Sequence, residues 1–389
     1  MITVALAGKP NCGKSTFFKA STLANVEIAN YPFTTIDANH GVAYVRTTCP
    51  CQELRLPCTE CQNGVRFVPV GMIDVAGLVP DAHKGRGLGN QFLDHLRTAD
   101  GILHIVDASG GTDTEGNPVS AGSHNPEEDI RFLYIEMTMW LYGILEKHWA
   151  KIQRQAQTGN FSPGPAVADT LAGLGITNDH VQQAEQESEV NLRRATEQDL
   201  ITFCDRLLRI AKPLLIVGNK VDQAPTLLVE KLTPLEITFV SAAAELALRT
   251  AATTHLIKYL PGDPSFSILK PEALNTAQKV GLGKIAEVMK KFGGTGVQTA
   301  INRAVLEMLD LVIVYPVEDE NKYSDRQGRV LPDAFLMKRG SNPRDLAHRV
   351  HTDIGKGFLY AVDARTKMRI KESYVLKNGD IIKIVSTAK

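Results

Sequence analysis

The segment that most constrains the fold lies near the start of the chain, where Gly8-Lys-Pro-Asn-Cys-Gly-Lys-Ser15 matches the pattern G-x-x-x-x-G-K-[ST]. An apolar segment at residues 2–7 precedes it and a helix-compatible segment follows, as this pattern requires. Backbone N–H groups of such a loop surround a phosphate, and the helix N-terminus points the same way. Lys14 is expected to reach the β- and γ-phosphates, and Ser15 to ligate Mg²⁺. The predicted phosphate-binding residues are Gly8, Lys9, Pro10, Asn11, Cys12, Gly13, Lys14, Ser15 and Thr16.

Short apolar segments alternate with longer helical patterns along much of the chain. These segments are continuously apolar and rich in β-branched residues, which is typical of strands buried on both faces of a parallel sheet. The pattern predicts a doubly wound, mainly parallel α/β sheet, the P-loop NTPase fold, with ligands at the carboxyl ends of the strands. The expected strands are residues 2–7, 65–73, 101–106, 213–217 and 236–240.

With 389 residues the chain is too long for one ordinary domain. A long segment between the third and fourth expected strands predicts an inserted antiparallel pair of helices, at residues 126–157 and about 177–208. The expected division is a nucleotide-binding domain at 1–109 and 205–262, a helical insertion at 110–204, a helical linker at 263–309 and a small α+β domain at 310–389.

Two further segments extend the phosphate site. Asp74-Val-Ala-Gly77 closes the expected strand at 65–73, where Asp74 can hold Mg²⁺ through water and the Gly77 N–H can contact the γ-phosphate. Between this segment and the phosphate loop lies Asn30-Tyr-Pro-Phe-Thr-Thr35, in which a threonine can complete the Mg²⁺ shell while the γ-phosphate is present. The alternative for this segment is an ordinary proline-containing turn.

A further motif, Asn219-Lys-Val-Asp222, follows the expected strand at 213–217 and indicates a guanine base. The Asp222 carboxylate can accept hydrogen bonds from the guanine N1–H and 2-amino group, whereas adenine offers no such pair of donors. Hydrogen bonds to charged groups contribute about 1.5–3 kcal/mol each, so adenine would lose several orders of magnitude in affinity. The predicted ligands are therefore GTP and GDP. The other expected contacts are Asn219 to the phosphate loop, Lys220 along the base, and a backbone N–H of Ser241 or Ala242 to the guanine carbonyl.

With these motifs the chain resembles the Obg-related branch of translation-factor GTPases, in particular the YchF group and its archaeal-type relatives. The resemblance is carried by Tyr-Pro-Phe-Thr-Thr at 31–35 and by the Gly-rich stretch from Asp74 to Arg97. It also rests on Gly340-Ser-Asn-Pro-Arg-Asp-Leu-Ala-His-Arg-Val-His351, which is similar to the helix of the TGS domain, a ubiquitin-like β-grasp module. The resemblance covers nearly the whole chain, and it favours Thr35 over Thr34 as the Mg²⁺ ligand. Typical YchF members relax the guanine motif and can favour ATP, whereas this chain keeps Asn-Lys-x-Asp.

Hydrolysis is expected to be slow without an activator, because Leu78 occupies the position where Ras-like enzymes use a glutamine to orient water. The resemblance places the chain among GTPases with a hydrophobic residue there, some of which recruit K⁺ through an asparagine that matches Asn11. Such an ion would neutralise charge developing between the phosphates; alternatively, Asn11 only stabilises the loop. His83 and His95 are candidates to replace the glutamine, or they are structural. The expected hinges of the switch segment are Gly77, Gly85, Gly87 and Gly89.

Four of the six cysteines fall within residues 49–61, which favours a local metal site over a spread-out disulfide framework. The second pair has the C-x₂-C spacing of zinc sites, and the first pair is tighter. Four thiolates could hold one Zn²⁺; reduced thiols or a disulfide pair are the alternatives. The candidate zinc ligands are Cys49, Cys51, Cys58 and Cys61.

The last domain is locally basic on a chain with 43 basic and 43 acidic side chains. Residues 338–389 hold 12 Lys and Arg against 5 Asp and Glu, which suits contacts with a phosphate backbone. The alternative is a solvated face balanced by the acidic residues 318–320. Resemblance to TGS domains favours the ribosome or structured RNA as partner, and the lack of a base-reading motif argues against sequence-specific DNA binding. The expected elements are strands at 312–315, 357–362 and 381–384 and a helix near 343–351.

The favoured hypothesis is a cytoplasmic GTPase that acts as a switch on the ribosome. No apolar run approaches the roughly 18 residues of a membrane span, and the first strand leaves no room for a signal peptide. A nucleotide-stabilised RNA-binding module with little turnover, or an ATPase as in typical YchF members, are the alternatives. A phosphotransferase acting on a small molecule would need no guanine motif, so Asp222 argues against it.

Overall fold

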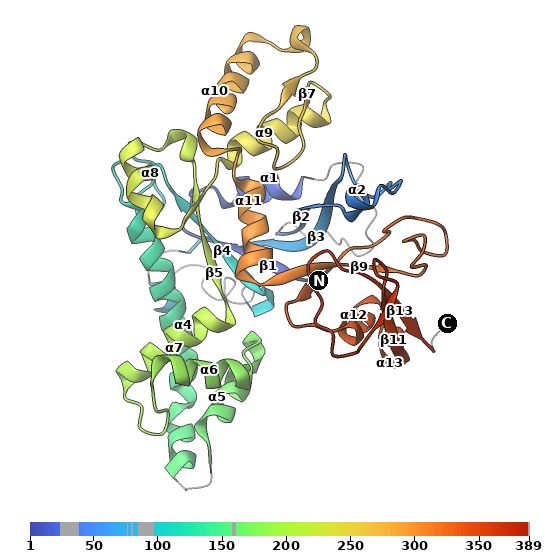
Figure 1. Cartoon of the computed structure of the whole chain (residues 1–389). Helices are drawn as coiled ribbons and strands as arrows, with labels where there is room; N and C mark the ends of the chain where they lie inside the picture. The colour runs from blue at the N-terminus through green and yellow to red at the C-terminus, as the bar shows by residue number, and fades with distance from the viewer. Residues whose placement is uncertain (24–38, 76, 79–80, 85–96, 158–160, 388–389) are drawn as a thin grey trace. The chain divides into compact units, whose positions relative to one another are not determined.

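The computed structural model describes residues 1–23, 39–75, 77–78, 81–84, 97–157 and 161–387 (Figure 1). The chain forms two compact units, the first from Met1–Ala43 and Gly71–Ala300 and the second from Tyr44–Val70 and Ile301–Lys389. Several predicted site residues lie outside the described residues: Thr35, Gly85, Gly87, Gly89 and His95.

A six-stranded sheet of order β2-β3-β1-β4-β5-β6 forms the centre of the P-loop fold. Strand β1 pairs in parallel with β3 and β4, and the pairs β4–β5 and β5–β6 are parallel as well. This confirms the mainly parallel sheet that the sequence predicts. The bounds are β1 Thr3–Ala7, β2 His40–Thr48, β3 Val65–Asp74, β4 Gly101–Asp107, β5 Leu214–Asn219 and β6 Thr238–Phe239.

The edge strand β2 is the strand of this sheet that the sequence does not predict. Only Ala43 and Val45 are buried in it, and its other residues are half-buried or exposed. A strand that is covered on one face alternates apolar and polar residues, so a search for continuously apolar segments passes over it.

Helices cover the sheet on both faces. Ala5 and Ala7 belong to a core that extends into the helices of the insertion, and alternate residues of a strand point to opposite faces. Val4 and Leu6 therefore face the other side, where α1 contacts β1 and α9. The bounds are α1 Lys14–Thr22, α8 Thr226–Leu232 and α9 Ala242–Thr253.

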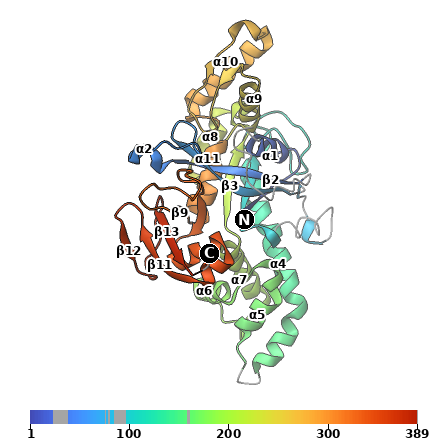
Figure 2. The ribbon, with the colours of Figure 1, turned by 90° about the vertical axis from the view of Figure 1, so that its right-hand side faces the viewer.

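The described residues of the insertion form four α-helices, where the sequence predicts an antiparallel pair. The predicted helix at 126–157 is confirmed as α4 Pro126–Gln157. Pro163 begins a helix of its own, because proline is tolerated in a first turn, and the second predicted helix is split where Thr196 forms a new capping box. Figures 1 and 2 show these helices side by side below the sheet, around one apolar core. The others are α5 Pro163–Leu171, α6 Asn178–Ser188 and α7 Glu197–Ala211.

A second small core in the first unit lies beyond α9, where Leu282 and Met289 of α10 pack with Leu248 and Tyr259. The elements of this region are β7 Ile257–Lys258, β8 Ser267–Ile268, α10 Thr276–Phe292 and α11 Val297–Asn302. Helix α11 continues as a π-helical turn, η6 Arg303–Met308. Among the described residues, no helix combines the length and the apolar character that crossing a bilayer requires.

The second unit contains a five-stranded sheet of order β10-β9-β13-β11-β12. Its central pair, β9 and β13, is parallel, and the flanking pairs are antiparallel. Leu346 and Ala347 of α12 pack on Val312, Val314 and Ile382 of the sheet. This is the predicted β-grasp domain. The bounds are α2 Pro50–Leu54, β9 Leu311–Val317, β10 Phe335–Lys338, α12 Pro343–Val350, α13 Thr352–Lys356, β11 Phe358–Asp363, β12 Met368–Ile370 and β13 Ile381–Ser386.

Candidate nucleotide-binding site

The phosphate loop joins β1 to α1 at the carboxyl edge of the sheet and depends on two glycines. Gly8 and Gly13 have φ values of 148° and 96°, in a region that disfavours residues with a Cβ atom. A Cβ atom on Gly8 would lie 2.3 Å from the carbonyl oxygen of Ile105, and one on Gly13 would lie 2.2 Å from Nδ2 of Asn219. The close approach of the loop to β4 and β5 therefore requires glycine at both positions.

The two lysines of the loop differ in their surroundings. The Lys14 ammonium group folds back over the loop and donates to the carbonyl oxygens of Gly8 at 3.1 Å and Lys9 at 2.8 Å. Lys9 lies 2.8 Å from Asp129 of α4 and also donates to the carbonyl oxygen of Thr112. Both Lys9 and Asp129 are buried, so the Lys9 side chain anchors the loop to α4. Only its backbone N–H is left for a phosphate, whereas Lys14 is held above the loop.

Asn11 and Cys12 are held in the loop by different contacts. Asn11 has a left-handed φ of 59°, and its Nδ2 donates to the carbonyl oxygen of Gly116 at 3.0 Å. Cys12 is buried, and burial raises the pKa of its thiol, so the thiol stays protonated at neutral pH. Ser15 is exposed at the first turn of α1, where its hydroxyl is accessible to an ion.

The segment after β3 lies against the phosphate loop. Oδ1 of Asp74 is buried and has no hydrogen-bond partner among the described residues. A buried carboxylate oxygen without a donor is costly, and a hydrated Mg²⁺ would satisfy it, so the residues present fit that ion. The Leu78 N–H donates to the carbonyl oxygen of Gly8 at 3.1 Å, and its side chain packs in the core with Val75 and Leu133. Leu78 therefore cannot orient a water molecule.

His83 contacts a carboxylate on α4. Its Nδ1 lies 2.7 Å from Oε2 of Glu136, and the backbone N–H groups of Asp81 and His83 donate to the same carboxylate at 2.8 and 3.0 Å. Glu136 is buried. The pair anchors the short 3₁₀ helix η1, Ala82–Lys84, to α4, and the sequence alone does not indicate Glu136 because it belongs to a long, charge-rich helix.

Asn219 connects the guanine motif to the phosphate loop, as the sequence predicts. Its Nδ2 donates to the carbonyl oxygen of Cys12 at 3.0 Å, and its Oδ1 accepts from the Ala242 N–H at 3.1 Å. The Ser241 N–H donates to the carbonyl oxygen of Thr295 at 2.9 Å, so both predicted base-carbonyl donors have protein acceptors. The neighbouring Ala243 N–H, in the first turn of α9, has no acceptor among the described residues.

Lys220 and Asp222 belong to the same motif but differ in their surroundings. Lys220 has a φ of 61°, and its Nζ is 2.8 Å from Oδ2 of Asp107, which is fully buried. Burial raises the pKa of Asp107, but hydrogen bonds from Lys220, Ser109 and Thr112 outweigh it and lower the pKa below the usual value. Asp222 is exposed in the turn η3, Val221–Gln223.

Asp107 is a site residue that the sequence reasoning does not include. It ends β4 in register with Asn219 of β5, so it follows the same rule that identifies Asp74, a carboxylate at the end of a buried strand. Applying that rule to every expected strand finds it.

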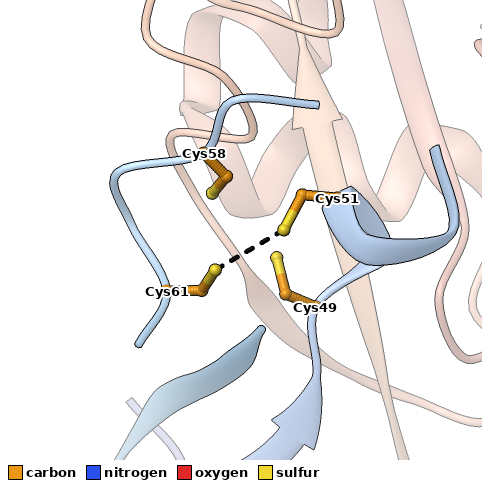
Figure 3. Close-up of side chains that lie close together, drawn as sticks. All are labelled: Cys49, Cys51, Cys58 and Cys61. Atoms are coloured by element: carbon orange, nitrogen blue, oxygen red, sulfur yellow. Dashed lines mark hydrogen bonds between the residues drawn. The ribbon is translucent and has the colours of Figure 1, made fainter. Parts of the chain in front are cut away.

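The four cysteines come together in the second unit (Figure 3). Their Sγ atoms all lie within 4.8 Å of one another, and those of Cys51 and Cys61 are 3.5 Å apart. All four are free thiols. Residues 49–64, here called the cysteine loop, carry them between β2 and β3.

The basic residues of the second unit are partly paired. Lys383 lies 2.5 Å from Glu320, and Arg365 lies 2.6 Å from Glu53. The acidic segment 318–320 thus balances part of the charge, as the solvated-face alternative expects. The exposed Arg369 lies over the Tyr360 ring, with 4.2 Å between its guanidinium carbon and the ring centroid. This cation–π pair is a surface that a nucleobase or phosphate could contact.

Comparisons with known proteins agree with this architecture. Residues 217–319 match the family described as Obg-like GTPase YGR210-like, G4 motif-containing domain. Residues 3–134 match the 50S ribosome-binding GTPase family, and residues 327–386 match the TGS domain.

Two relatives match over the whole chain or nearly so, and a third over about half of it. An uncharacterised GTP-binding protein of Methanocaldococcus jannaschii is 46% identical over 398 residues, which cover 100% of both chains. The crystal structure of a GTP binding protein from Pyrococcus horikoshii is 40% identical with a TM-score of 0.78, covering 99% of this chain and 100% of that one. The ribosome-binding ATPase YchF of Bacillus subtilis is 34% identical over 220 residues, 56% of each chain. The chain belongs to the YchF-like family of Obg-related GTP-binding proteins and carries the TGS domain at its C-terminal end.

Proposed function

We propose that this chain binds GTP with Mg²⁺, hydrolyses it slowly to GDP and phosphate, and uses the two nucleotide states as a switch on the ribosome. The observation that carries the proposal is the double hydrogen bond of Asn219 to the phosphate loop and to α9. It holds the exposed Asp222 in a motif that is joined to the phosphate loop, as a guanine nucleotide spanning both would need.

The phosphate side of the proposal rests on Lys14, Ser15 and Asp74. Lys14 is held over the loop, where its charge would meet the β- and γ-phosphates. Ser15 and the unpartnered Oδ1 of Asp74 would hold Mg²⁺, with Thr35 as the expected third ligand. The ion supplies charge neutralisation on the β- and γ-phosphate oxygens. The Gly77 N–H completes the proposed γ-phosphate contacts.

Base selectivity gives the sharpest test. Asp222→Asn should weaken GTP binding and improve XTP binding, because an asparagine amide donates to the xanthine 2-carbonyl and no longer accepts from a 2-amino group. We expect each change to be about 100-fold, since two hydrogen bonds to a charged group are involved. Asp222→Ala is the matched control and should weaken GTP without gaining XTP. Equal affinity of the parent chain for GTP and ATP would favour an ATPase, the activity in the name of the Bacillus subtilis relative.

The proposed hydrolysis is slow because Leu78 is buried and supplies no water-orienting group. We assign a K⁺ site to Asn11, whose Nδ2 bond to Gly116 fixes the amide and leaves Oδ1 as an acceptor. GTP turnover should then be faster in KCl than in NaCl at equal ionic strength. Asn11→Gly, which tolerates the left-handed φ, should abolish the difference. Equal rates for the parent chain in both salts would remove K⁺ from the mechanism.

The ribosome is the proposed partner because the chain matches a 50S ribosome-binding GTPase family and ends in a basic TGS domain. This partner would place the protein in the cytoplasm. Co-sedimentation with ribosomes should depend on whether GDP or a non-hydrolysable GTP analogue is bound. Lys14→Ala, which weakens nucleotide binding, should remove that dependence. Equal binding in both nucleotide states would favour the constitutive RNA-binding module.

A further inference from the structure

We propose that the four cysteines of the cysteine loop bind one Zn²⁺ ion, and that this ion fixes the loop to the C-terminal β-grasp domain. The proposal is independent of the nucleotide site. It rests on the geometry of the sulfur atoms, the lack of an apolar core in the loop, a buried cation beside the cluster and the contacts between the loop and residues 330–365.

The sulfur atoms converge on one point (Figure 3). Cys49 and Cys51 come from the start of α2, whereas Cys58 and Cys61 come from the irregular segment that leads from α2 back to β3. A tetrahedral zinc site with Zn–S bonds of about 2.3 Å has sulfur atoms about 3.8 Å apart. The observed separations, all within 4.8 Å and 3.5 Å for one pair, need only small side-chain adjustments to reach this geometry.

The loop has little else to hold it. Residues 52–63 are exposed or half-buried, so they contribute little apolar burial. The Cys49 N–H donates to the carbonyl oxygen of Gly64 at 2.8 Å, and the Leu56 N–H donates to that of Cys51 at 2.9 Å. Both bonds involve the backbone of a cysteine. Small segments without a core usually depend on a metal or a disulfide for a fixed structure.

Convergence of all four thiols distinguishes zinc from its alternatives. Two disulfides would separate the sulfur atoms into two pairs, and one disulfide would leave two thiols with no reason to approach it. Free thiols would not need to converge, because a buried thiol packs as a small apolar group. A metal is the arrangement that uses every sulfur atom.

A buried arginine supplies compensating charge. Zn²⁺ with four thiolates carries a net charge of −2, which is costly to bury alone. Arg66 is buried, its Nη2 donates to the carbonyl oxygen of Pro332 at 2.9 Å, and its Nη1 has no partner among the described residues. Its acceptor Pro332 is two residues from Val330, whose carbonyl oxygen contacts Sγ of Cys58. A cation next to the ligands would offset part of this negative charge.

The loop and the start of β3 contact the C-terminal part of the same unit at three places. Sγ of Cys58 lies 3.7 Å from the carbonyl oxygen of Val330, Arg66 bonds to Pro332, and Glu53 pairs with Arg365 at 2.6 Å. Four protein ligands leave no open coordination position, so the proposed site is structural and not catalytic. Zinc binding would therefore order the loop and the 330–332 segment together.

Metal analysis of the full-length chain tests the proposal. Protein purified from zinc-supplemented cells and dialysed against EDTA should retain about one zinc per chain. Replacing zinc by Co²⁺ should give the intense thiolate-to-cobalt absorption of a four-sulfur site. Cys61→Ser should reduce retained zinc about tenfold or more and shift the cobalt spectrum. Cys204→Ala, at a buried cysteine of α7, is the matched control and should change neither.

The role of the ion is tested separately by hydrogen exchange. In Cys61→Ser, amides of residues 49–64 and those of Val330 and Leu331 should exchange faster, while those of α1 should keep their rates. Folded parent protein that contains no zinc and takes up no Co²⁺ would overturn the site. Thiol titration would then show reduced cysteines or, if thiols appear only after reduction, a disulfide. Zinc retention with unchanged exchange in the variant would overturn the fixing role.

Discussion

Lys9 and Asp129 face one another at 2.8 Å with both side chains buried, and Lys220 meets the fully buried Asp107 at the same distance. Removing one partner of such a pair leaves a buried charge and costs about 3–5 kcal/mol. These pairs thus fix the positions of the phosphate loop and of the guanine motif relative to α4 and β4. His104 is a buried titratable residue near the same loop that has no such partner: its Nδ1 bonds to nothing among the described residues.

His104 should make the fold sensitive to acid. Burial, and then the charge of Lys14, lower its pKa to about 3, below the value of about 6.5 for an unfolded chain. Below pH 6.5 the unfolded state binds a proton that the folded state excludes, so stability falls as the pH falls; above pH 6.5 the residue has no effect. His104→Leu should reduce the loss of unfolding free energy between pH 7.5 and 5 by about 2 kcal/mol in urea titrations.

The control for this prediction is His148→Leu, at an exposed position of α4. It should leave the pH dependence of the parent chain unchanged. If His104→Leu loses as much stability as the parent between the two pH values, the folded protein accepts the proton and His104 is not the acid-sensitive group.

At the residue scale, the sequence identifies the residues that belong to a recognisable motif. The glycine positions, Lys14 and Asn219 follow from the loop patterns, and the structure confirms the Asn219 connection. Glu136 and the Ala243 N–H do not follow from any pattern. Their roles depend on which hydrogen-bond donors and acceptors are paired in the folded chain, and tertiary contacts determine that pairing.

At the scale of elements, Thr295 connects the start of α11 to the guanine-motif side of the sheet. Its carbonyl oxygen accepts from the Ser241 N–H, and its hydroxyl donates to the buried Glu245 of α9. Tyr259 donates to the same carboxylate at 2.6 Å, and Arg249, one turn further along α9, donates to the carbonyl oxygens of Ala20 and Leu23 at the end of α1. The position of α9 is thus linked both to the base loop and to the phosphate-loop helix.

Thr295→Val should therefore weaken guanine-nucleotide binding without touching the nucleotide. Valine keeps the shape of threonine and removes one donor to a buried carboxylate, at a cost of about 1–3 kcal/mol in unfolding free energy. We expect a several-fold rise in the Kd for GDP, measured by titration calorimetry, because the Ser241 loop loses support.

Thr253→Val is the matched control, since Thr253 is an exposed residue of α9 whose hydroxyl donates to its own helix. It should leave the Kd unchanged. A variant at 295 that loses stability but binds GDP like the parent would show that the base loop is positioned without this contact.

Element boundaries show where the sequence is sufficient and where it is not. Helix α4 has a proline and acidic residues in its first turn and a long amphipathic pattern, and its predicted bounds are confirmed. The helices after it are shorter, and proline at 163 indicates either a break or a start. Only the core that α5, α6 and α7 share with α4 decides between these readings.

At the scale of the whole molecule, the chain order does not match the division into compact units. Residues 44–70 lie between two segments of the first unit in sequence but belong to the second. The hydrogen bonds between Arg46 and Asn302, in both directions, join residues far apart in the chain. Sequence patterns report local periodicity, so they cannot reveal such a partnership.

The two units should respond to different ligands. GDP with Mg²⁺ contacts only residues of the first unit in our proposal, so saturation at about 100 times the Kd should stabilise that unit by about 2.7 kcal/mol. The slowest amides of β1, β4 and β5 should then exchange about 100-fold more slowly, while those of β9, β11 and β13 keep their rates. Lys14→Ala, as control, should abolish the effect. Equal slowing in both sheets would mean that the units unfold together, since a ligand protects every amide that exchanges through the opening it suppresses.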